Sequence, residues 1–238
     1  TSASYQQSSA QSSLILENDP NNLLLSHAPR QRLAAESVRD HVLAVSGLLV
    51  EKRGGPGVQP YQPAALFGRN AIGSSNASFK QGSGDDLYRR SLYTYWKRQI
   101  PAANMRILGA DGRVSCRTRR ELTNTPLQAL VLLNDPQFVE AARALGTRAM
   151  KEGGESIESR LAYAFRLSTS RTANASELAI LVAEFEDRLG EFEKDLPRAK
   201  AYLAGGGALK ADPDLDPAQL AAYAAVASLI LNLDESIS

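Results

Sequence analysis

The chain has 238 residues, a formal net charge of +1 and an apolar fraction of 43%, a composition typical of a globular protein with a sizeable core. Its single cysteine, Cys116, excludes an intrachain disulfide, a CxxCH haem-attachment motif and a four-ligand zinc pattern built on cysteine pairs. It contains no run of about 18 apolar residues, so we expect no membrane span.

The N-terminal residues, TSASYQQSSAQSS, lack an initiator methionine, a basic segment and the apolar core of a signal peptide. We therefore expect residues 1–18 to continue from a missing upstream part, and residues 19–238 to form a single helical domain. The first clear helix is expected over residues 30–46, with an apolar stripe and a glycine directly after it. His41 borders that stripe. We interpret His41 as a hydrogen-bonded residue at the edge of the core rather than as a metal ligand or a catalytic base. His27 is the only other histidine, and two histidines alone are weak evidence for a metal site.

Residues 47–86 are rich in glycine and proline and show little periodicity. Apolar and aromatic side chains recur through the segment, which indicates an irregular cover packed on the domain rather than a flexible linker. The run Gly54-Gly55-Pro56-Gly57 lacks a preceding strand and a following GK[ST], so it does not predict a phosphate-binding loop.

A second helix is expected over residues 86–99 and a small hairpin around Ala110-Asp111-Gly112. The expected helix has an aromatic face formed by Tyr88, Leu92, Tyr95 and Trp96. At helical spacing such a face is usually a core face, but aromatics interleaved with basic residues also suit sugar rings or nucleic acid.

Two abutting helices are encoded around residues 125–145. Thr125, Pro126 and Gln128 form a capping-box pattern with proline at the first helical position. Asp135 and Pro136 repeat the signal for the next helix. We expect Thr125, Gln128 and Asp135 to be structural caps rather than catalytic groups. Further helices are expected over residues 136–150, 157–167, 174–196 and from Pro217 onward. The predicted fold class is mainly α, an irregular multi-helix bundle with one long Gly/Pro-rich segment and at most a small β-hairpin.

The charge is unevenly distributed along the chain. Residues 1–120 have a balance of +8 and residues 121–238 a balance of −7. Either the two halves neutralise each other in the fold, or the basic segment presents a cationic face to an anionic partner. The candidate anion-binding or ligand-binding residues are Arg89, Arg90, Trp96, Arg117, Arg119 and Arg120. In the internal alternative, one or more of the last three arginines pairs with acids of the C-terminal half, such as Glu140, Glu184 or Asp187.

Five blocks occur in a recognisable order: RLAAESVRDHVLAVSG, GGPGVQPYQP, DLYRRSLYTYWKR, SCRTRRELTNTPLQALVLLNDPQFVEAARAL and ASLILNLDES. With these blocks the chain resembles a planctomycete-specific C-terminal domain of unknown function. The resemblance covers roughly residues 19–235. It implies a place in large exported proteins, often with cytochrome-c-type domains upstream, and hence an extracytoplasmic location in the periplasm or cell envelope. It supplies no catalytic residues.

Two functions are weighed. The first is a non-catalytic interaction or scaffolding module within an exported, cytochrome-c-associated multidomain protein, where other domains of the same polypeptide, a haem domain among them, are the partners. The second is a carbohydrate-active domain that binds or hydrolyses an anionic polysaccharide. The first is favoured because neither G-x-S-x-G nor HExxH occurs in the sequence. We expect no metal and no cofactor in this chain, haem only in associated domains, and no nucleic-acid partner because the total charge is balanced.

Overall fold

The computed structural model describes residues 2–3, 6–10, 12–29, 31–62, 80–97, 101–113, 116, 118, 120 and 123–238. Backbone contacts divide the chain into two units. The N-terminal unit is Thr1–Leu33 together with Ser238, and the helical unit is Ala34–Ile237. The division therefore falls after Leu33, whereas the sequence suggested a boundary after residue 18.

The N-terminal unit contains one short helix, α1 (Ser13–Asn18), which begins after the Ser12 cap. The loop that follows is organised by Asp19, whose carboxylate accepts the backbone N–H groups of Leu23 and Leu24 at 2.7 and 2.9 Å. These hydrogen bonds lower the pKa of Asp19 against the opposing effect of burial.

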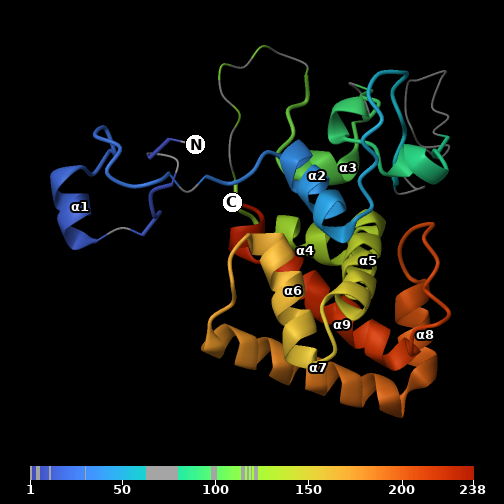
Figure 1. Cartoon of the computed structure of the whole chain (residues 1–238). Helices are drawn as coiled ribbons and strands as arrows, with labels where there is room; N and C mark the ends of the chain where they lie inside the picture. Colours follow the sequence, from blue (N-terminus) through green and yellow to red (C-terminus); the bar gives the residue numbers. More distant parts are fainter. Residues whose placement is uncertain are drawn as a thin grey trace. The chain divides into compact units, whose positions relative to one another are not determined.

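The helical unit is built around α9 (Pro217–Leu231), which is buried on nearly every side (Figure 1). A helix that is apolar all round belongs in the centre of a bundle. It packs against α5 (Pro136–Glu152), and the two backbones approach closely at Gly146. A Cβ at Gly146 would lie 2.9 Å from the backbone nitrogen of Ala224, so only glycine allows this crossing.

Three helices surround this pair from the C-terminal half. They are α6 (Ile157–Thr169), α7 (Ala175–Lys194) and α8 (Leu196–Ala204), of which α6 and α7 lie close to the helices expected from sequence. Asp195 lies between the last two and caps α8 by accepting the Arg198 N–H at 3.0 Å, with Pro197 in the first turn of α8. A local cap and a local proline thus begin this helix.

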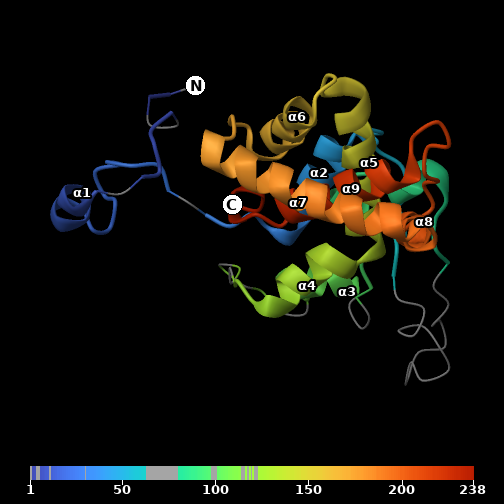
Figure 2. The same ribbon diagram turned by 90° about the horizontal axis from the view of Figure 1, so that it is seen from below.

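The N-terminal part of this unit supplies α2 (Ala35–Ser46), α3 (Ala103–Ile107) and α4 (Pro126–Asn134). Seen from below, α3 and α4 lie on one side of the unit and α6 on the other, with α5 and α9 between them (Figure 2). Helix α2 begins five residues later than expected and ends before Gly47, as predicted.

The predicted helix over residues 86–99 is wrong for the part that the structure describes. Residues 84–97 form only two short 3-10 turns, Gly84–Leu87 and Ser91–Tyr93. The guanidinium of the buried Arg39 donates hydrogen bonds to the carbonyl oxygens of Leu87 and Arg89, at 2.8 Å each. The backbone N–H of Val58 donates to the carbonyl oxygen of Tyr93 at 2.8 Å. These carbonyls would otherwise accept the i→i+4 bonds of an α-helix, so tertiary partners replace the helix. The expected aromatic face is lost with it, and Leu92 and Tyr95 are exposed.

The expected hairpin is also wrong, because its first strand is the helix α3. Elsewhere the irregular cover behaves as predicted where it is described, since Val58 and Tyr61 are buried. Leu66, Phe67, Ile72 and Phe79 lie outside the described residues.

The mainly helical fold class is confirmed. Within the described ranges, the β-structure consists of two isolated bridges, Val50 with Arg89 and Val58 with Thr94. In those same ranges, no helix has the length and apolar character needed to cross a bilayer.

Candidate functional site

Arg89, a candidate ligand-binding residue, is buried and holds the irregular cover in place. Its guanidinium donates to the carbonyls of Pro56 and Lys52 at 3.0 Å each and to that of Gly54. It also stacks over the ring of Tyr93 with its central carbon 3.9 Å from the ring centroid. With a side chain 2% exposed, Arg89 serves the fold and is not open to an outside anion.

Arg90 and Arg120 both lie against α2. Nε of Arg90 is 3.9 Å from Asp40, and Nη1 of Arg120 is 2.7 Å from Glu36. The two acids are one helical turn apart, so α2 brings two of the candidate arginines to one face. Arg120, one of the three arginines considered for pairing with acids of the C-terminal half, pairs instead with Glu36 of the N-terminal half.

The remaining members of the candidate cluster give a mixed picture. Arg117 and Arg119 lie outside the described residues. Trp96 is half-buried, and the guanidinium of Arg113 lies over its ring at 4.8 Å. Neither of the two cavities formed by the described residues is lined by Arg90, Trp96 or Arg120.

The predicted caps are present. The Thr125 N–H donates to Oε1 of Gln128 at 3.3 Å, and the Asp135 carboxylate accepts the Gln137 N–H at 3.0 Å. Gln128 does more than the capping box requires, because its amide also donates to the carbonyl of Ile107 at 2.9 Å. It thereby ties the end of α3 to the start of α4. Burial raises the pKa of Asp135, against the hydrogen bonds that it accepts.

A buried polar cluster that the sequence did not predict is centred on Glu140 of α5. Its Oε1 accepts the hydroxyls of Tyr61 and Tyr88 at 3.2 and 3.0 Å and the N–H of Leu209. Burial, and then the hydrogen bond with Tyr61, raises the pKa of Tyr88. Since Glu140 is fully buried, the cluster joins the cover to the loop after α8 rather than forming an open reaction centre.

Histidine and cysteine give no metal site in the described part of the chain, where no group of three or more His, Cys, Asp or Glu side chains could hold an ion. His41 is half-buried on α2, and burial lowers its pKa. His27 is buried in the N-terminal unit.

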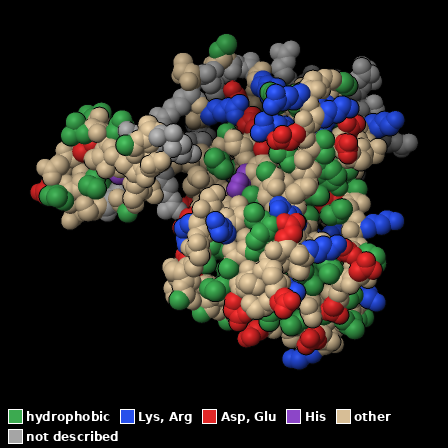
Figure 3. Space-filling model, viewed as in Figure 1, with side chains coloured by type: hydrophobic (Ala, Val, Ile, Leu, Met, Phe, Trp, Pro, Cys, Tyr) green, Lys and Arg blue, Asp and Glu red, His purple; other side chains and the backbone are tan. Residues whose placement is uncertain are grey.

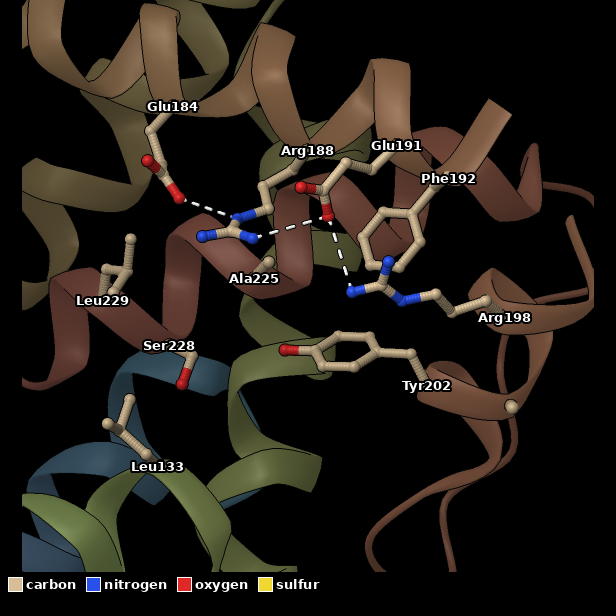
Figure 4. A pocket seen from close by; sticks show the side chains of 11 residues that line it. Leu133, Glu184, Arg188, Glu191, Phe192, Arg198, Tyr202, Ala225, Ser228 and Leu229 are labelled. Carbon is tan, nitrogen blue, oxygen red and sulfur yellow. Dashed lines mark hydrogen bonds and ion pairs between the residues drawn. The ribbon is translucent and has the colours of Figure 1, made fainter. Parts of the chain in front are cut away.

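A groove of about 430 Å³ lies between α4, α7, α8 and α9 of the helical unit (Figure 4). We call it the α7–α9 groove. Its floor and walls are mainly apolar: Phe192 and Tyr202 lie with ring centroids 5.6 Å apart, and Leu133 and Leu229 line one end on either side of Ser228. Leu229 is 41% exposed and Tyr202 is 37% exposed, so the apolar surface is available to a partner.

Four charged side chains form the rim of the α7–α9 groove. Arg188 lies 2.7 Å from Glu184 and 3.5 Å from Glu191, and Arg198 lies 3.5 Å from Glu191 (Figure 4). The charges of the two acids and the two arginines cancel, so the rim has no strong net electrostatic field. Its separate charges can still favour one orientation of a bound partner.

The groove continues into an exposed apolar stripe on α4. Leu127, Leu130 and Leu133 recur every three residues, with exposed fractions of 52%, 55% and 38%. The rest of the helical unit is more charged: Figure 3 shows Lys and Arg gathered at the end that holds α2 and α3, and Asp and Glu more frequent along α7. The leucine stripe was visible in the sequence, but its exposure was not, because a short apolar helix normally predicts burial.

Comparison with known proteins identifies a family. Residues 1–185 match the family model described as "PSD1: Protein of unknown function (DUF1553)". No curated protein and no solved structure matches the chain. Because the matched residues make up well over half of the sequence, the chain belongs to the PSD1 (DUF1553) family.

Proposed function

We propose that this chain is a non-catalytic interaction module, and that the α7–α9 groove is its docking surface. The observation that carries the proposal is the continuous apolar surface formed by the groove and the α4 stripe. Large apolar surfaces left open on a folded domain are costly in water and mark sites of association.

The occupant that fits best is an amphipathic helix from another domain of the same polypeptide. A helix presents apolar side chains every three to four residues, which matches the spacing of Leu127, Leu130 and Leu133 on the facing surface. The balanced rim of Glu184, Arg188, Glu191 and Arg198 can pair with mixed charges beside that helix's apolar face. The same balance offers no excess positive charge to a polyanion.

The wider context of the proposal comes from the sequence resemblance. In that context the module belongs to a larger exported protein of planctomycete type, located in the periplasm or cell envelope. Haem is carried by its cytochrome-c-type domains and not by this chain. The module then holds neighbouring domains together.

The test is a binding measurement between this chain and the remaining domains of its polypeptide, produced separately and mixed in a calorimeter. The double variant Leu133→Glu/Leu229→Glu places two charges on the apolar surface, and we expect it to weaken binding at least tenfold. Ile180→Glu is the matched control, because Ile180 is 68% exposed on α7 and does not line the groove. Unchanged binding by the double variant, with the control also unchanged, would remove the groove from the proposal.

The alternative function is a carbohydrate-active domain for an anionic polysaccharide. The gathering of Lys and Arg near α2 and α3 favours it, together with the 56% exposure of the Arg90 side chain. On this alternative, Arg90→Gln and Arg120→Gln would weaken salt-sensitive retention on a heparin column with little change in melting temperature. Retention unaffected by both substitutions would count against it.

A further inference from the structure

A second cavity lies on the other side of α8 from the groove's lining residues. It has a volume of about 550 Å³ and is bounded by the end of α8, the loop 205–215, the first turn of α9 and Arg143 of α5. We call it the α8–α9 cavity. It shares no lining residue with the α7–α9 groove, so an inference about it stands apart from the proposed function. Its size is typical of pockets that hold small molecules.

The polar part of the lining is basic. Arg143, Lys200 and Lys210 line the cavity with a single acid, Asp212. The Asp212 carboxylate is already engaged by Lys151 and by the Asp214 N–H at 3.0 Å. Lys200 and Lys210 are exposed and form no ion pair with a described residue. The buried carboxylate of Glu140 lies beside Arg143 and offsets its charge, so Lys200 and Lys210 are the cations that favour an anionic ligand.

Arg143 adds a preorganised group at the back of the cavity. Its side chain is 3% exposed, and its terminal nitrogens donate to the carbonyls of Leu203, Gly205, Gly206 and Leu209. These bonds fix the guanidinium. Its Nε–H is buried and, among the described residues, has no hydrogen-bond partner. A buried donor without a partner is costly, and the burial of this side chain makes Arg143 part of the cavity wall.

The rest of the lining is apolar. It consists mainly of leucine, alanine and proline, with Leu203 and Leu220 buried and Leu215 half-buried. The lining contains no aromatic side chain on which a base or sugar ring could stack. An anionic head at the two lysines would leave the remainder of the ligand against this apolar surface.

We propose that the α8–α9 cavity binds a carboxylate that carries an apolar chain. Lys200 and Lys210 hold the carboxylate, and the leucines contact the chain. The two halves of this chemistry are both required: a bare anion lacks the apolar contact, and a neutral chain leaves the cations without a partner.

The test titrates the whole chain with octanoate in a calorimeter, and repeats the titration with 1-octanol and with inorganic phosphate. We expect octanoate to saturate one site and the other two probes to bind at least tenfold more weakly. Equal affinity for octanol would show that the cavity recognises only the apolar chain, and equal affinity for phosphate would show that it recognises only the anion. Either outcome, or no saturable octanoate binding, overturns the proposal.

Two variants locate the site. Lys200→Gln/Lys210→Gln removes the exposed cations, and we expect at least a tenfold loss of octanoate affinity with the melting temperature unchanged. Lys194→Gln is the control, because it removes a lysine of α7 that lines neither cavity. Octanoate affinity that is unchanged by the double variant, or reduced equally by the control, places the ligand elsewhere and contradicts the proposal.

Discussion

The carboxyl group of Glu140 occupies the space that a side chain at Gly207 would need. A Cβ at this glycine would lie 2.2 Å from the Cδ of Glu140, and Gly207 has a φ of +74°. Glu140 also accepts the N–H of Leu209, two residues further along the same loop. The loop after α8 can therefore close over α5 only with glycine at this position, for steric and for backbone reasons.

Gly207→Ala is expected to destabilise the helical unit. Overpacking against a buried carboxyl costs about 1–3 kcal/mol, and the left-handed backbone adds about 1 kcal/mol for a residue with a Cβ. Urea denaturation followed by circular dichroism measures the change in unfolding free energy.

The same substitution at Gly190, Gly190→Ala, is expected to raise the unfolding free energy instead of lowering it. Gly190 lies inside α7 with no atom within 4 Å of an added Cβ, so alanine should stabilise by about 0.5–1 kcal/mol. A Gly207→Ala variant as stable as the wild type would contradict the close approach to Glu140.

Arg39→Met should destabilise by about 3 kcal/mol or more. Arg39 is 1% exposed and donates to Gln137 at 2.6 Å as well as to the carbonyls of Leu87 and Arg89. Its removal leaves Oε1 of Gln137 and the carbonyl of Arg89 unsatisfied, each at a cost of about 1–3 kcal/mol, while the Leu87 carbonyl keeps the Gln137 Nε2–H at 3.0 Å. Hydrogen exchange should show faster opening of residues 87–95 than in the wild type. Arg166→Met, at an exposed position of α6, should change neither measurement.

Asp135→Ala and Thr125→Ala should each lower the unfolding free energy by about 0.5–2 kcal/mol, the usual cost of losing a helix cap. Asp135 accepts the Gln137 N–H at the start of α5, and the Thr125 side chain belongs to the capping box of α4. Thermal melts measure both effects, with Asp187→Ala on the exposed face of α7 as the control. Either cap variant melting like the control would show that its cap contributes nothing.

Glu177 predicts a defined pH dependence. Hydrogen bonding to Arg171, and then the Asn174 N–H, lowers the pKa of Glu177 from 4.5 to about 2. The folded state therefore binds fewer protons than the unfolded state between these values. Its contribution to stability is present above pH 4.5 and is lost as the pH falls through about 2. Melting temperatures should fall less steeply over this interval in Glu177→Gln than in wild type. Parallel profiles would contradict the assignment, and Glu186→Gln, at an exposed site of α7, should follow the wild type.

The helices that the sequence predicted correctly are those with local boundary signals. Asn174 and Glu177 start α7, Asp135 and Pro136 start α5, and Asp216 and Pro217 start α9. Caps act within three or four residues, so the sequence contains the whole interaction. The same reasoning failed over residues 86–97, where an apparently helical spacing was overruled by partners about fifty residues away, such as Arg39.

The candidate site divides in the same way. Arg89 and Arg90 are adjacent in the sequence and equally basic, yet one is buried under the cover and the other is mostly exposed beside Asp40. The groove and the α8–α9 cavity have no sequence signature, because each is lined by residues from at least three separate helices or loops.

By itself, the sequence determined a mainly helical chain, the ends of its C-terminal helices and its caps, since these depend on periodicity and on hydrogen bonds between near neighbours. Only the tertiary structure decided which arginines are buried, where Glu140 lies and which leucines remain exposed. Burial depends on which surfaces meet when distant segments pack, and a single sequence read locally does not contain that information.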